Sequence, residues 1–389
     1  MKIVMINSVC GIRSTGRICT DLAQSLTRDG HIVRIAYGRE HVPKQFQQYA
    51  VRIGSKSDVR FHAMRSRLFD ESGFGSKRAT LEFIKWMKEF DPDIIHLHNL
   101  HGYYINVELL FAYLRTCGKK ILWTLHDCWA FTGHSAYFDC LECESRGICN
   151  HSSQKNDYPK SFLDFSKRNF QRKKNCFTQI PNLTIITPSQ WLADLVKQSF
   201  LKEYPVKVIH NGIDTTIFKP RPVAAQELRK TFHLEGKQVL LGVAAIWNDR
   251  KGFPDLLELA SHLTDHQRIV LIGLKEKQLK HLPKGIIGLR ETNSPEELAA
   301  WYTLADVFLN PTYQDNYPTT NLEAIACGTP VISYPTGGSV ESARLYGLVC
   351  KECKTADIVD AINNLGNVVN PENLDFSIVT FNGNMKKLY

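Results

Sequence analysis

The chain alternates short apolar runs with longer amphipathic segments, and this alternation occurs twice along its 389 residues. Such a pattern is typical of parallel β-sheets covered by helices. In the first half, the runs lie at residues 3–6, 32–37, 51–53, 94–98, 121–125, 183–186 and 206–209. In the second half, they lie at residues 239–246, 268–272, 286–289, 306–309 and 331–334. The expected fold class is therefore α/β, with two doubly wound parallel sheets.

The chain length also indicates two domains, because single hydrophobic cores stop growing at roughly 250–300 residues. We predict Rossmann-like domains over residues 1–212 and 236–370, with a proline-containing linker at 213–235. The segment 371–389 has a weak pattern and is expected to pack back across a domain. Open parallel sheets bind ligands beyond the carboxyl ends of their strands, so we expect ligand in a cleft between two facing sheets.

The composition is that of an ordinary folded protein, with 43% hydrophobic and 22% charged residues. No apolar run approaches the roughly 18 residues of a membrane span, and no cleavage site follows the first apolar run. A cytoplasmic enzyme is expected. Eleven cysteines form an odd set, which favours reduced thiols over a disulfide framework.

The net charge is +9, and part of the excess lies between residues 160 and 174. Such a charge favours phosphate-bearing partners or peripheral contact with an anionic membrane. The alternative interpretation is a solvated helix face. No nucleic-acid partner is expected, since no zinc-finger, helix-turn-helix or RNA-binding aromatic pattern accompanies the charge. The basic residues are Lys160, Lys167, Arg168, Arg172, Lys173 and Lys174.

Residues 310–330 form the most informative segment of the chain, reading NPTYQDNYPTTNLEAIACGTP. The segment leads from a predicted strand into a predicted helix. We expect Thr319 or Thr320 to cap this helix, whose free backbone amides can then hold a nucleotide phosphate. Asp315 and Glu323 flank the turn. Without the surrounding pattern, they would be interpreted as a turn residue and a surface helix residue.

This segment resembles glycosyltransferase family 4, in which two acidic residues with seven others between them precede a Cys-Gly-Thr-Pro sequence. The resemblance implies the GT-B fold and transfer with retention of anomeric configuration. It also implies that Asp315 contacts the donor sugar and that Glu323 holds the ribose hydroxyls. Aspartate replaces the usual glutamate at position 315, which changes the reach towards the sugar. The intervening residues assigned to donor binding are Asn316, Tyr317, Pro318, Thr319 and Thr320.

A second resemblance to the family lies at Lys251 and Gly252, which match its Lys-Gly pair. There the lysine neutralises the departing diphosphate, which is a charge-stabilising role. The arginine usual in the family lies five positions earlier, where this chain has Ile246, and Arg250 is the nearest substitute. The alternative is that Arg250 and Lys251 are solvated residues at the start of a helix.

In the first domain, the loop at residues 11–17 joins a strand to a helix. It lacks the Gly-x-Gly-x-x-Gly dinucleotide pattern. The equivalent loop of the family borders the acceptor and the diphosphate, which implicates Gly16 and Arg17. An ordinary turn is the alternative interpretation.

Histidines gather at the ends of two predicted strands. The strand ending in His126 and Asp127 resembles the histidine-bearing strand of the family, which reaches a hydroxyl of the donor sugar. Asp127 is expected to orient the imidazole or to meet the acceptor. His98 and His101, near the end of a neighbouring strand, are assigned to the acceptor side. A satisfied core histidine is the alternative interpretation for His126.

A cysteine-rich insert follows Asp127, and its Cys-x-x-Cys spacing is typical of zinc ligands. A structural zinc site is one interpretation, and reduced thiols in an ordinary loop are the other. No cofactor is expected to be required for catalysis. The only Asp-x-Asp, at residues 91–93, enters a strand and so lies at the wrong end of the sheet. The candidate zinc ligands are Cys128, Cys140, Cys143 and Cys149.

The family resemblance implies a reaction and a setting. A hexose would move from a nucleotide-sugar, with a UDP-sugar as the expected donor, to a glycan or a polyprenyl-diphosphate-linked oligosaccharide. The setting would be bacterial capsule, O-antigen or exopolysaccharide synthesis, with the enzyme cytoplasmic or peripheral on the membrane. Two other classes stay open. One is a nucleotide-sugar epimerase, and the other is a non-catalytic partner subunit in which the changes at Asp315 and Ile246 have ended catalysis.

Overall fold

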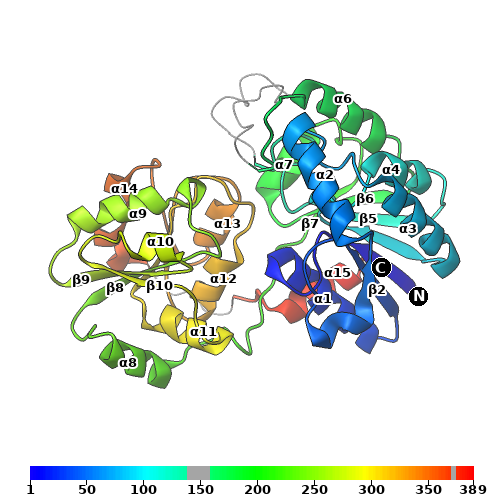
Figure 1. The fold of residues 1–389 in the computed structure, drawn as a ribbon. Helices are drawn as coiled ribbons and strands as arrows, with labels where there is room; N and C mark the ends of the chain where they lie inside the picture. Colours follow the sequence, from blue (N-terminus) through cyan, green and yellow to red (C-terminus); the bar gives the residue numbers. More distant parts are fainter. Residues whose placement is uncertain (138–157, 369–373) are drawn as a thin grey trace. The chain divides into compact units, whose positions relative to one another are not determined.

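The computed structural model describes residues 1–137, 158–368 and 374–389 and divides the chain into two compact units (Figure 1). Unit 1 comprises residues 1–209 together with 382–389, and unit 2 comprises residues 210–381. Each unit is built on its own parallel sheet. The prediction of an α/β chain with two doubly wound parallel sheets is confirmed.

Unit 1 has a seven-stranded sheet in the order β3-β2-β1-β4-β5-β6-β7, and every described pairing in it is parallel. The strands are β1 (Lys2–Ile6), β2 (Ile32–Tyr37), β3 (Ala50–Arg52), β4 (Ile94–Leu97), β5 (Lys120–Thr124), β6 (Leu183–Thr187) and β7 (Val206–Val208). The helices are α1 (Arg13–Arg28), η1 (Lys44–Tyr49), α2 (Lys56–Phe69), α3 (Lys77–Phe90), α4 (Val107–Leu114), α6 (Ser166–Phe177) and α7 (Gln190–Gln198).

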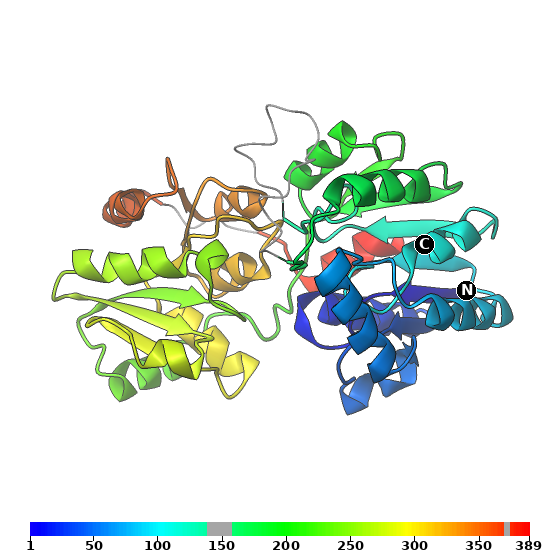
Figure 2. The same ribbon diagram turned by 45° about the horizontal axis from the view of Figure 1, so that its top comes forward.

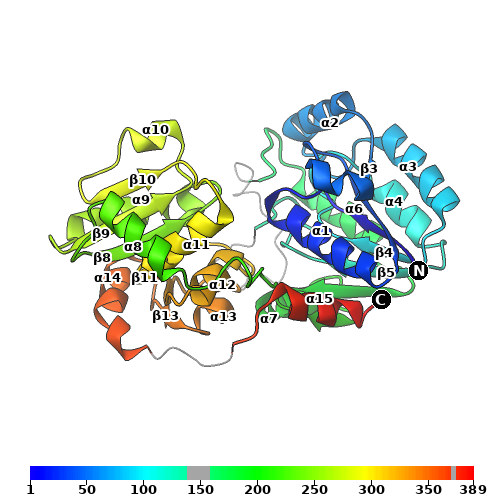
Figure 3. The same cartoon turned by 90° about the horizontal axis from the view of Figure 1, so that it is seen from below.

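Successive side chains of a strand point to opposite faces of the sheet, and β4 shows this clearly. Ile95 and Leu97 belong to the hydrophobic core that includes residues of α3, α4 and α6. His96 points to the opposite face, where its ring contacts that of Tyr389. The ribbon shows α15 (Ile378–Lys386) leading to this position (Figures 2 and 3).

Unit 2 has a six-stranded parallel sheet in the order β10-β9-β8-β11-β12-β13. Its strands are β8 (Gln238–Val243), β9 (Gln267–Ile272), β10 (Ile286–Leu289), β11 (Val307–Asn310), β12 (Val331–Ser333) and β13 (Gly347–Val349). Its helices are α8 (Pro222–Thr231), η2 (Asp249–Lys251), α9 (Phe253–Leu259), η3 (Ala260–His262), α10 (Glu276–Leu279), α11 (Pro295–Leu304), α12 (Thr319–Ala326), α13 (Ser339–Ala343), α14 (Thr355–Asn363) and η4 (Leu365–Asn367).

The structure differs from the sequence-based expectation in three places. The expected linker at 213–235 contains α8, a helix of unit 2 that begins at Pro222, where proline suits the first turn. The three-residue strand β13 is too short to show a period in the sequence. Residues 378–386 form α15, although their apolar pattern is weak. The described residues include no helix long and apolar enough to cross a bilayer.

Candidate active site

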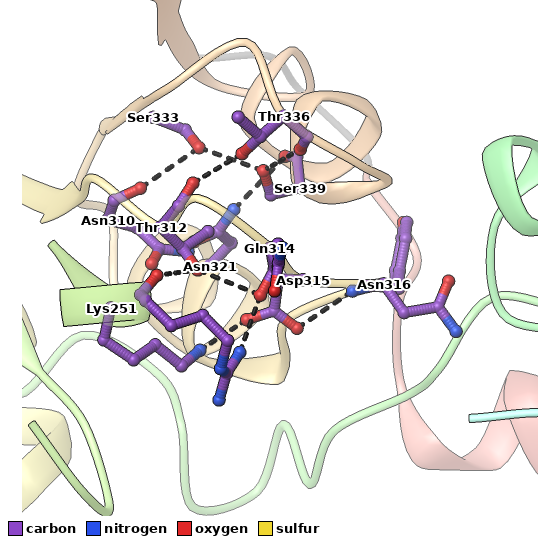
Figure 4. Close-up of polar contacts among 12 residues, drawn as sticks. Lys251, Asn310, Thr312, Gln314, Asp315, Asn316, Asn321, Ser333, Thr336 and Ser339 are labelled. Atoms are coloured by element: carbon purple, nitrogen blue, oxygen red, sulfur yellow. Dashed lines mark hydrogen bonds and ion pairs between the residues drawn. The ribbon is translucent and has the colours of Figure 1, made fainter. Parts of the chain in front are cut away.

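An ion pair between Lys251 and Asp315 occupies the carboxyl-terminal end of the sheet in unit 2 (Figure 4). Lys251 Nζ lies 2.5 Å from Asp315 Oδ2, and the two side chains are 22% and 20% exposed. Lys251 follows β8 and Asp315 follows β11, and these two strands are neighbours in the sheet. The structure thus joins two residues that the sequence separates by 64 positions.

The backbone around this pair is shaped by two glycines with positive φ. Gly252 has φ +68°, and a Cβ atom there would overlap the carbonyl oxygen of Pro311. Gly337 has φ +54°, and a Cβ atom there would overlap the carbonyl oxygen of Asp315. Only glycine fits such close backbone approaches without displacement. The loop carrying Asp315 is therefore held against its neighbours by main-chain packing.

Arg250, the predicted substitute for the missing family arginine, contacts the same loop. Its guanidinium donates to the carbonyl oxygen of Gln314 at 2.6 Å, and its own carbonyl accepts from the Tyr313 amide at 2.8 Å. Ile246, at the position of the usual arginine, is 48% exposed. Arg250 therefore braces the loop beside Asp315.

Glu323 lies on the first turns of α12 and is half-buried. The hydroxyl of the fully buried Tyr302 donates to its Oε2 at 3.1 Å. Burial, together with the nearby Glu323 charge, raises the pKa of Tyr302 well above its usual value, so the phenol stays a donor. The contact fixes one carboxylate oxygen of Glu323.

The expected cap of α12 by Thr319 or Thr320 is wrong. The helix begins at Thr319, its N-cap is Pro318, and no side chain caps it. Proline has no side-chain acceptor, and the threonines lie one and two positions too far along to reach back to the amides of the first turn. The Asn321 amide donates to the Pro318 carbonyl at 3.2 Å, and no side chain of this turn takes the amides of Thr319 and Thr320.

The remaining predicted donor-binding residues lie between the ion pair and α12. Asn316, Tyr317 and Pro318 are buried. The Tyr317 carbonyl accepts from the Asn211 side chain at 3.1 Å, and the Tyr317 ring stacks on His210 with centroids 4.7 Å apart. Tyr317 thus packs the segment against His210 and Asn211, at the start of unit 2.

A buried amide network that the sequence pattern did not reveal holds β11 to α12. Asn310 Nδ2 donates to Asn321 Oδ1 at 2.8 Å, and Asn321 Nδ2 donates to Ser342 Oγ at 2.9 Å. Figure 4 shows Asn310 and Asn321 next to the loop that carries Asp315. The only local signal is an asparagine at a strand end, which is common in turns.

Unit 1 gathers its predicted residues at the carboxyl-terminal ends of β4 and β5. His98 Nδ1 lies 3.0 Å from His126 Nε2, and their rings stack with centroids 5.3 Å apart. His101 Nε2 lies 2.7 Å from Asp127 Oδ2, while Asp127 Oδ1 accepts from the Trp129 amide at 3.0 Å. All four predicted residues of this cluster therefore lie close together.

Burial controls the charge of this cluster. It lowers the pKa of His126 to about 4 against the opposing effect of Asp127, and it holds the pKa of His98 well below the usual value. Burial alone would raise the pKa of Asp127, but His101 and the Trp129 amide outweigh it and lower that pKa. At neutral pH the cluster combines a neutral imidazole pair with a carboxylate.

Two residues far along the chain join this cluster, and local sequence could not reveal them. The Tyr389 hydroxyl lies 2.5 Å from His96 Nδ1, and His96 Nε2 lies 2.8 Å from Thr124 Oγ1. The His96 and His98 rings are 4.1 Å apart. The Tyr158 hydroxyl lies 3.2 Å from His101 Nδ1. These contacts add the last residue of the chain and Tyr158 to the cluster.

The glycine loop of unit 1 precedes α1, which begins at Arg13. Gly16 is buried within the helix, and its carbonyl accepts from the Gly11 amide at 3.1 Å. Arg17 is exposed on α1. The loop is a tight strand-to-helix turn, and the structure shows no contact between Arg17 and the histidine cluster.

The structure describes only one of the four predicted zinc ligands. Cys140, Cys143 and Cys149 lie outside the described residues. Cys128 is buried. Within residues 1–137, 158–368 and 374–389, no three His, Cys, Asp or Glu side chains are grouped as metal ligands.

The basic cluster at residues 160–174 is not one solvated face. Lys173 is fully buried on α6 and donates to the carbonyls of Trp129 and Thr132 at 2.7 and 3.1 Å. Arg172 makes a two-pronged contact with Glu108 at 2.8 Å. Lys173 therefore braces the interior and Arg172 is half-buried in an ion pair, whereas Lys160, Lys167, Arg168 and Lys174 are exposed.

Comparisons with known proteins identify the family and the fold. Residues 15–217 match the family model of glycosyltransferase family 4, and residues 237–367 match that of glycosyl transferases group 1. A putative colanic acid biosynthesis glycosyl transferase, WcaC of Escherichia coli K12, is 24% identical over 363 residues, which cover 89% of this chain and 86% of the relative.

Two further relatives match about half of their length. A D-inositol 3-phosphate glycosyltransferase of Arthrobacter is 32% identical over 203 residues, 46% of each chain. The N,N'-diacetylbacillosaminyl-diphospho-undecaprenol α-1,3-N-acetylgalactosaminyltransferase of Campylobacter jejuni is 28% identical over 183 residues, 44% of this chain and 48% of the relative.

Solved structures share the fold across the whole chain. Sucrose-phosphate synthase from Thermosynechococcus elongatus superposes with a TM-score of 0.69 at 14% identity, covering 100% of this chain and 98% of the other. Anabaena HepE in complex with UDP superposes with a TM-score of 0.66 at 15% identity, covering 100% and 99%. The chain is a glycosyltransferase with the GT-B fold, and it belongs to glycosyltransferase family 4.

Proposed function

We propose that this enzyme transfers a hexose from a UDP-sugar, with retention of anomeric configuration, to a glycan or a polyprenyl-diphosphate-linked oligosaccharide in bacterial surface polysaccharide synthesis. The Lys251–Asp315 pair beside the first turn of α12 carries the proposal. Similar proteins support its finer parts. HepE is described with UDP and UDP-glucose, WcaC with colanic acid biosynthesis, and the Campylobacter enzyme with a diphospho-undecaprenol substrate.

In this proposal, Lys251 binds the donor diphosphate. Its ammonium is partly exposed and already held by a carboxylate, so it is fixed in position before donor binds. The first-turn amides of α12, including those of Thr319 and Thr320, add partial positive charge that favours an anion. Both groups stabilise the negative charge that develops on the departing UDP. Arg250 supports this role by holding the loop at Gln314.

Asp315 and Glu323 would bind the hydroxyls of the donor. Once the diphosphate takes the Lys251 ammonium, the Asp315 carboxylate can accept from a sugar hydroxyl at the same place. Glu323, positioned by the Tyr302 hydroxyl, would bind the ribose hydroxyls. Asn316, Tyr317 and Pro318 contribute the packed backbone that sets the separation of these two acids.

His126 and its neighbours would act on the sugar and acceptor side. A neutral imidazole can donate from one ring nitrogen and accept at the other, which suits contact with a sugar hydroxyl. Asp127 and His98 would orient the His126 ring. His98, His101, Gly16 and Arg17 are assigned to the acceptor side. In a retaining reaction of this kind, the leaving phosphate itself accepts the proton of the acceptor hydroxyl.

The donor site is proposed to need no divalent cation, because Lys251 and the α12 amides supply positive charge for the diphosphate. Turnover measured with EDTA should equal turnover with added Mg²⁺ or Mn²⁺. A loss of turnover in EDTA that added Mg²⁺ restores would contradict metal independence. Metal analysis of the purified protein tests the structural zinc separately.

Donor identity is tested by calorimetric titration with UDP, GDP and CMP. UDP should bind, and Glu323→Ala should weaken its affinity by roughly 10-fold or more through loss of the ribose contact. Glu296→Ala, an exposed acid on α11, is the matched control and should bind like the unchanged enzyme. Preferential binding of GDP or CMP would contradict the UDP assignment.

The stereochemical course is tested by NMR of the product. The anomeric proton coupling of the transferred sugar should match that of the donor, as retention requires. Inversion would contradict the proposal. Conversion of donor to a free epimer without acceptor would instead support the epimerase alternative.

A further inference from the structure

Six large apolar side chains of unit 1 are exposed at one place. Four lie on α2 and two on the segment that leads to α6, and their exposed fractions run from 39% to 63%. We call them the apolar patch. Its members are Phe61, Met64, Leu68, Phe69, Phe162 and Leu163.

The exposed apolar face of α2 is unusual for a surface helix. Phe61, Met64 and Leu68 are spaced by three and four residues, which places them on one side of the helix. His62 and Ser66 are instead the buried residues of α2. A surface helix normally turns its apolar stripe to the core and its polar side to water. A cluster of exposed apolar side chains marks a contact surface.

Direct contacts join the two segments of the patch. The Phe162 amide donates to the Arg67 carbonyl at 2.8 Å, and the Arg67 guanidinium lies 4.7 Å from the centre of the Phe162 ring. Arg168 donates to the Phe69 carbonyl at 3.2 Å. Residues about 100 positions apart in the sequence therefore form one continuous surface.

The charge around the patch is positive. Residues 59–69 contain no carboxylate, and residues 160–168 contain one, Asp164. The exposed cations on these segments are Arg60, Arg67, Lys160, Lys167 and Arg168. Apolar side chains with a cationic rim match the interface of an anionic bilayer, in which acyl chains lie beneath negative headgroups.

The patch is also connected to the histidine cluster. His134, on the loop that follows Asp127, lies 2.6 Å from Asp70, which ends α2. Tyr158, which contacts His101, lies two residues before Lys160. A membrane at the patch would therefore lie near the residues assigned to the acceptor.

We propose that the apolar patch and its cationic rim dock unit 1 on an anionic membrane surface. The purpose of docking rests on the proposed lipid-linked acceptor, but the binding itself does not. Membrane binding can therefore be measured without donor, acceptor or turnover.

The test is cosedimentation of the full chain with vesicles of phosphatidylglycerol mixed with phosphatidylcholine. The triple variant Phe61→Ser, Met64→Ser, Leu68→Ser should bind roughly 100-fold more weakly, because three apolar side chains no longer enter the interface. Arg60→Gln, Lys160→Gln, Lys167→Gln should weaken binding by roughly 100-fold, from about 1 kcal/mol per cation. Salt should weaken binding of the unchanged protein.

The control variants remove the same numbers of exposed apolar side chains and cations at positions outside the apolar patch and its cationic rim. Leu81→Ser, Val223→Ser, Val379→Ser removes three exposed apolar side chains, and Lys277→Gln, Lys280→Gln, Lys284→Gln removes three exposed cations. Both controls should bind vesicles like the unchanged protein. Urea unfolding checks that all variants are folded, and UDP titration shows that the donor site is intact.

Several results would overturn the proposal. They are absence of vesicle binding by the unchanged protein, equal losses in the control triples, or equal binding to phosphatidylcholine alone. Self-association that the patch variants abolish, with vesicle binding unaffected, would assign the surface to a second copy of the chain. If the unchanged protein binds vesicles but not UDP, the proposed donor site is wrong and the membrane proposal stands.

Discussion

The polar clusters of the two units differ in the charge of their side chains. In unit 1, the low pKa values of His96, His98 and His126 keep their rings neutral at pH 7. His96 contacts two hydroxyl groups, and His98 contacts His126. Unit 1 also contains the half-buried His31 and the exposed His41. In unit 2, the cluster is the partly exposed ion pair of Lys251 and Asp315 on a loop packed by glycines. The histidines of unit 2 are all exposed.

This difference separates stability from ligand binding. A buried neutral imidazole resists protonation, so it couples the folding of unit 1 to pH. A partly exposed ion pair contributes little to stability, but it keeps two charged groups ready for exchange with a ligand. Acid should therefore act mainly on the stability of unit 1, whereas substitution of the ion pair should act mainly on ligand binding and turnover.

Acidification should give the largest effect. Burial lowers the pKa of His62 and His126 to about 4 and that of His96 to about 3. Between about pH 6.5 and 4, the unfolded chain binds protons that folded unit 1 does not, so stability falls as pH falls. From pH 7 to 5, each histidine should cost about 2 kcal/mol. Pulse proteolysis in urea, with fragments identified by mass spectrometry, should show unit 1 losing more stability than unit 2. Equal losses would contradict the comparison.

Substitution of Lys251 should give the next effect, and it should act on turnover. Lys251→Met should lower kcat by roughly 100- to 1000-fold, because the charge that stabilises the leaving diphosphate is lost. The free energy of unfolding should change by less than about 1 kcal/mol, since the pair is partly exposed. Lys277→Met, an exposed lysine of α10, should leave both quantities unchanged. A folded Lys251→Met enzyme with normal kcat would remove Lys251 from the mechanism.

Lys173 tests whether burial of another ionisable group also makes the stability of unit 1 depend on pH. Lys173→Met should lower the free energy of unfolding by about 2–4 kcal/mol, because the carbonyls of Trp129 and Thr132 lose their donor. Burial lowers the pKa of Lys173 to about 7, so its contribution to stability falls as pH falls from 10.5 towards 7. Urea unfolding between pH 7 and pH 9 should show this slope, and the variant should lack it. An unchanged slope would assign it to other groups.

Tyr302→Phe should give the smallest effect and sharpens the role of Glu323. Removing the hydroxyl leaves Glu323 Oε2 without this donor, which should raise the donor KM by roughly 5-fold, about 1 kcal/mol. The value of kcat should stay within about 2-fold, because the ribose does not react. Tyr346→Phe, a half-buried tyrosine of the same unit, is the control. A large fall in kcat with unchanged KM would contradict a binding role.

Much of the candidate site could be predicted from the sequence because its residues follow strand ends. Asp315, Lys251, His98 and His126 each come after a short apolar run, and parallel strands bring their carboxyl ends to one edge. The cap of α12 could not be predicted well, because threonine and proline at adjacent positions both suit a helix start. Which residue becomes the N-cap depends on where the backbone first takes helical dihedral angles, here at Thr319.

The amino-acid sequence by itself determined the two parallel sheets, because apolar periodicity reports which backbone segments are extended and buried. It also determined which residue types stand at the strand ends. Tertiary structure alone decided the partners, such as Lys251 with Asp315 and His96 with Tyr389, since these contacts join distant segments. It also decided that Lys173 is buried while the neighbouring Lys174 is exposed. Burial and charge depend on what packs against a side chain, and local periodicity carries no record of those neighbours.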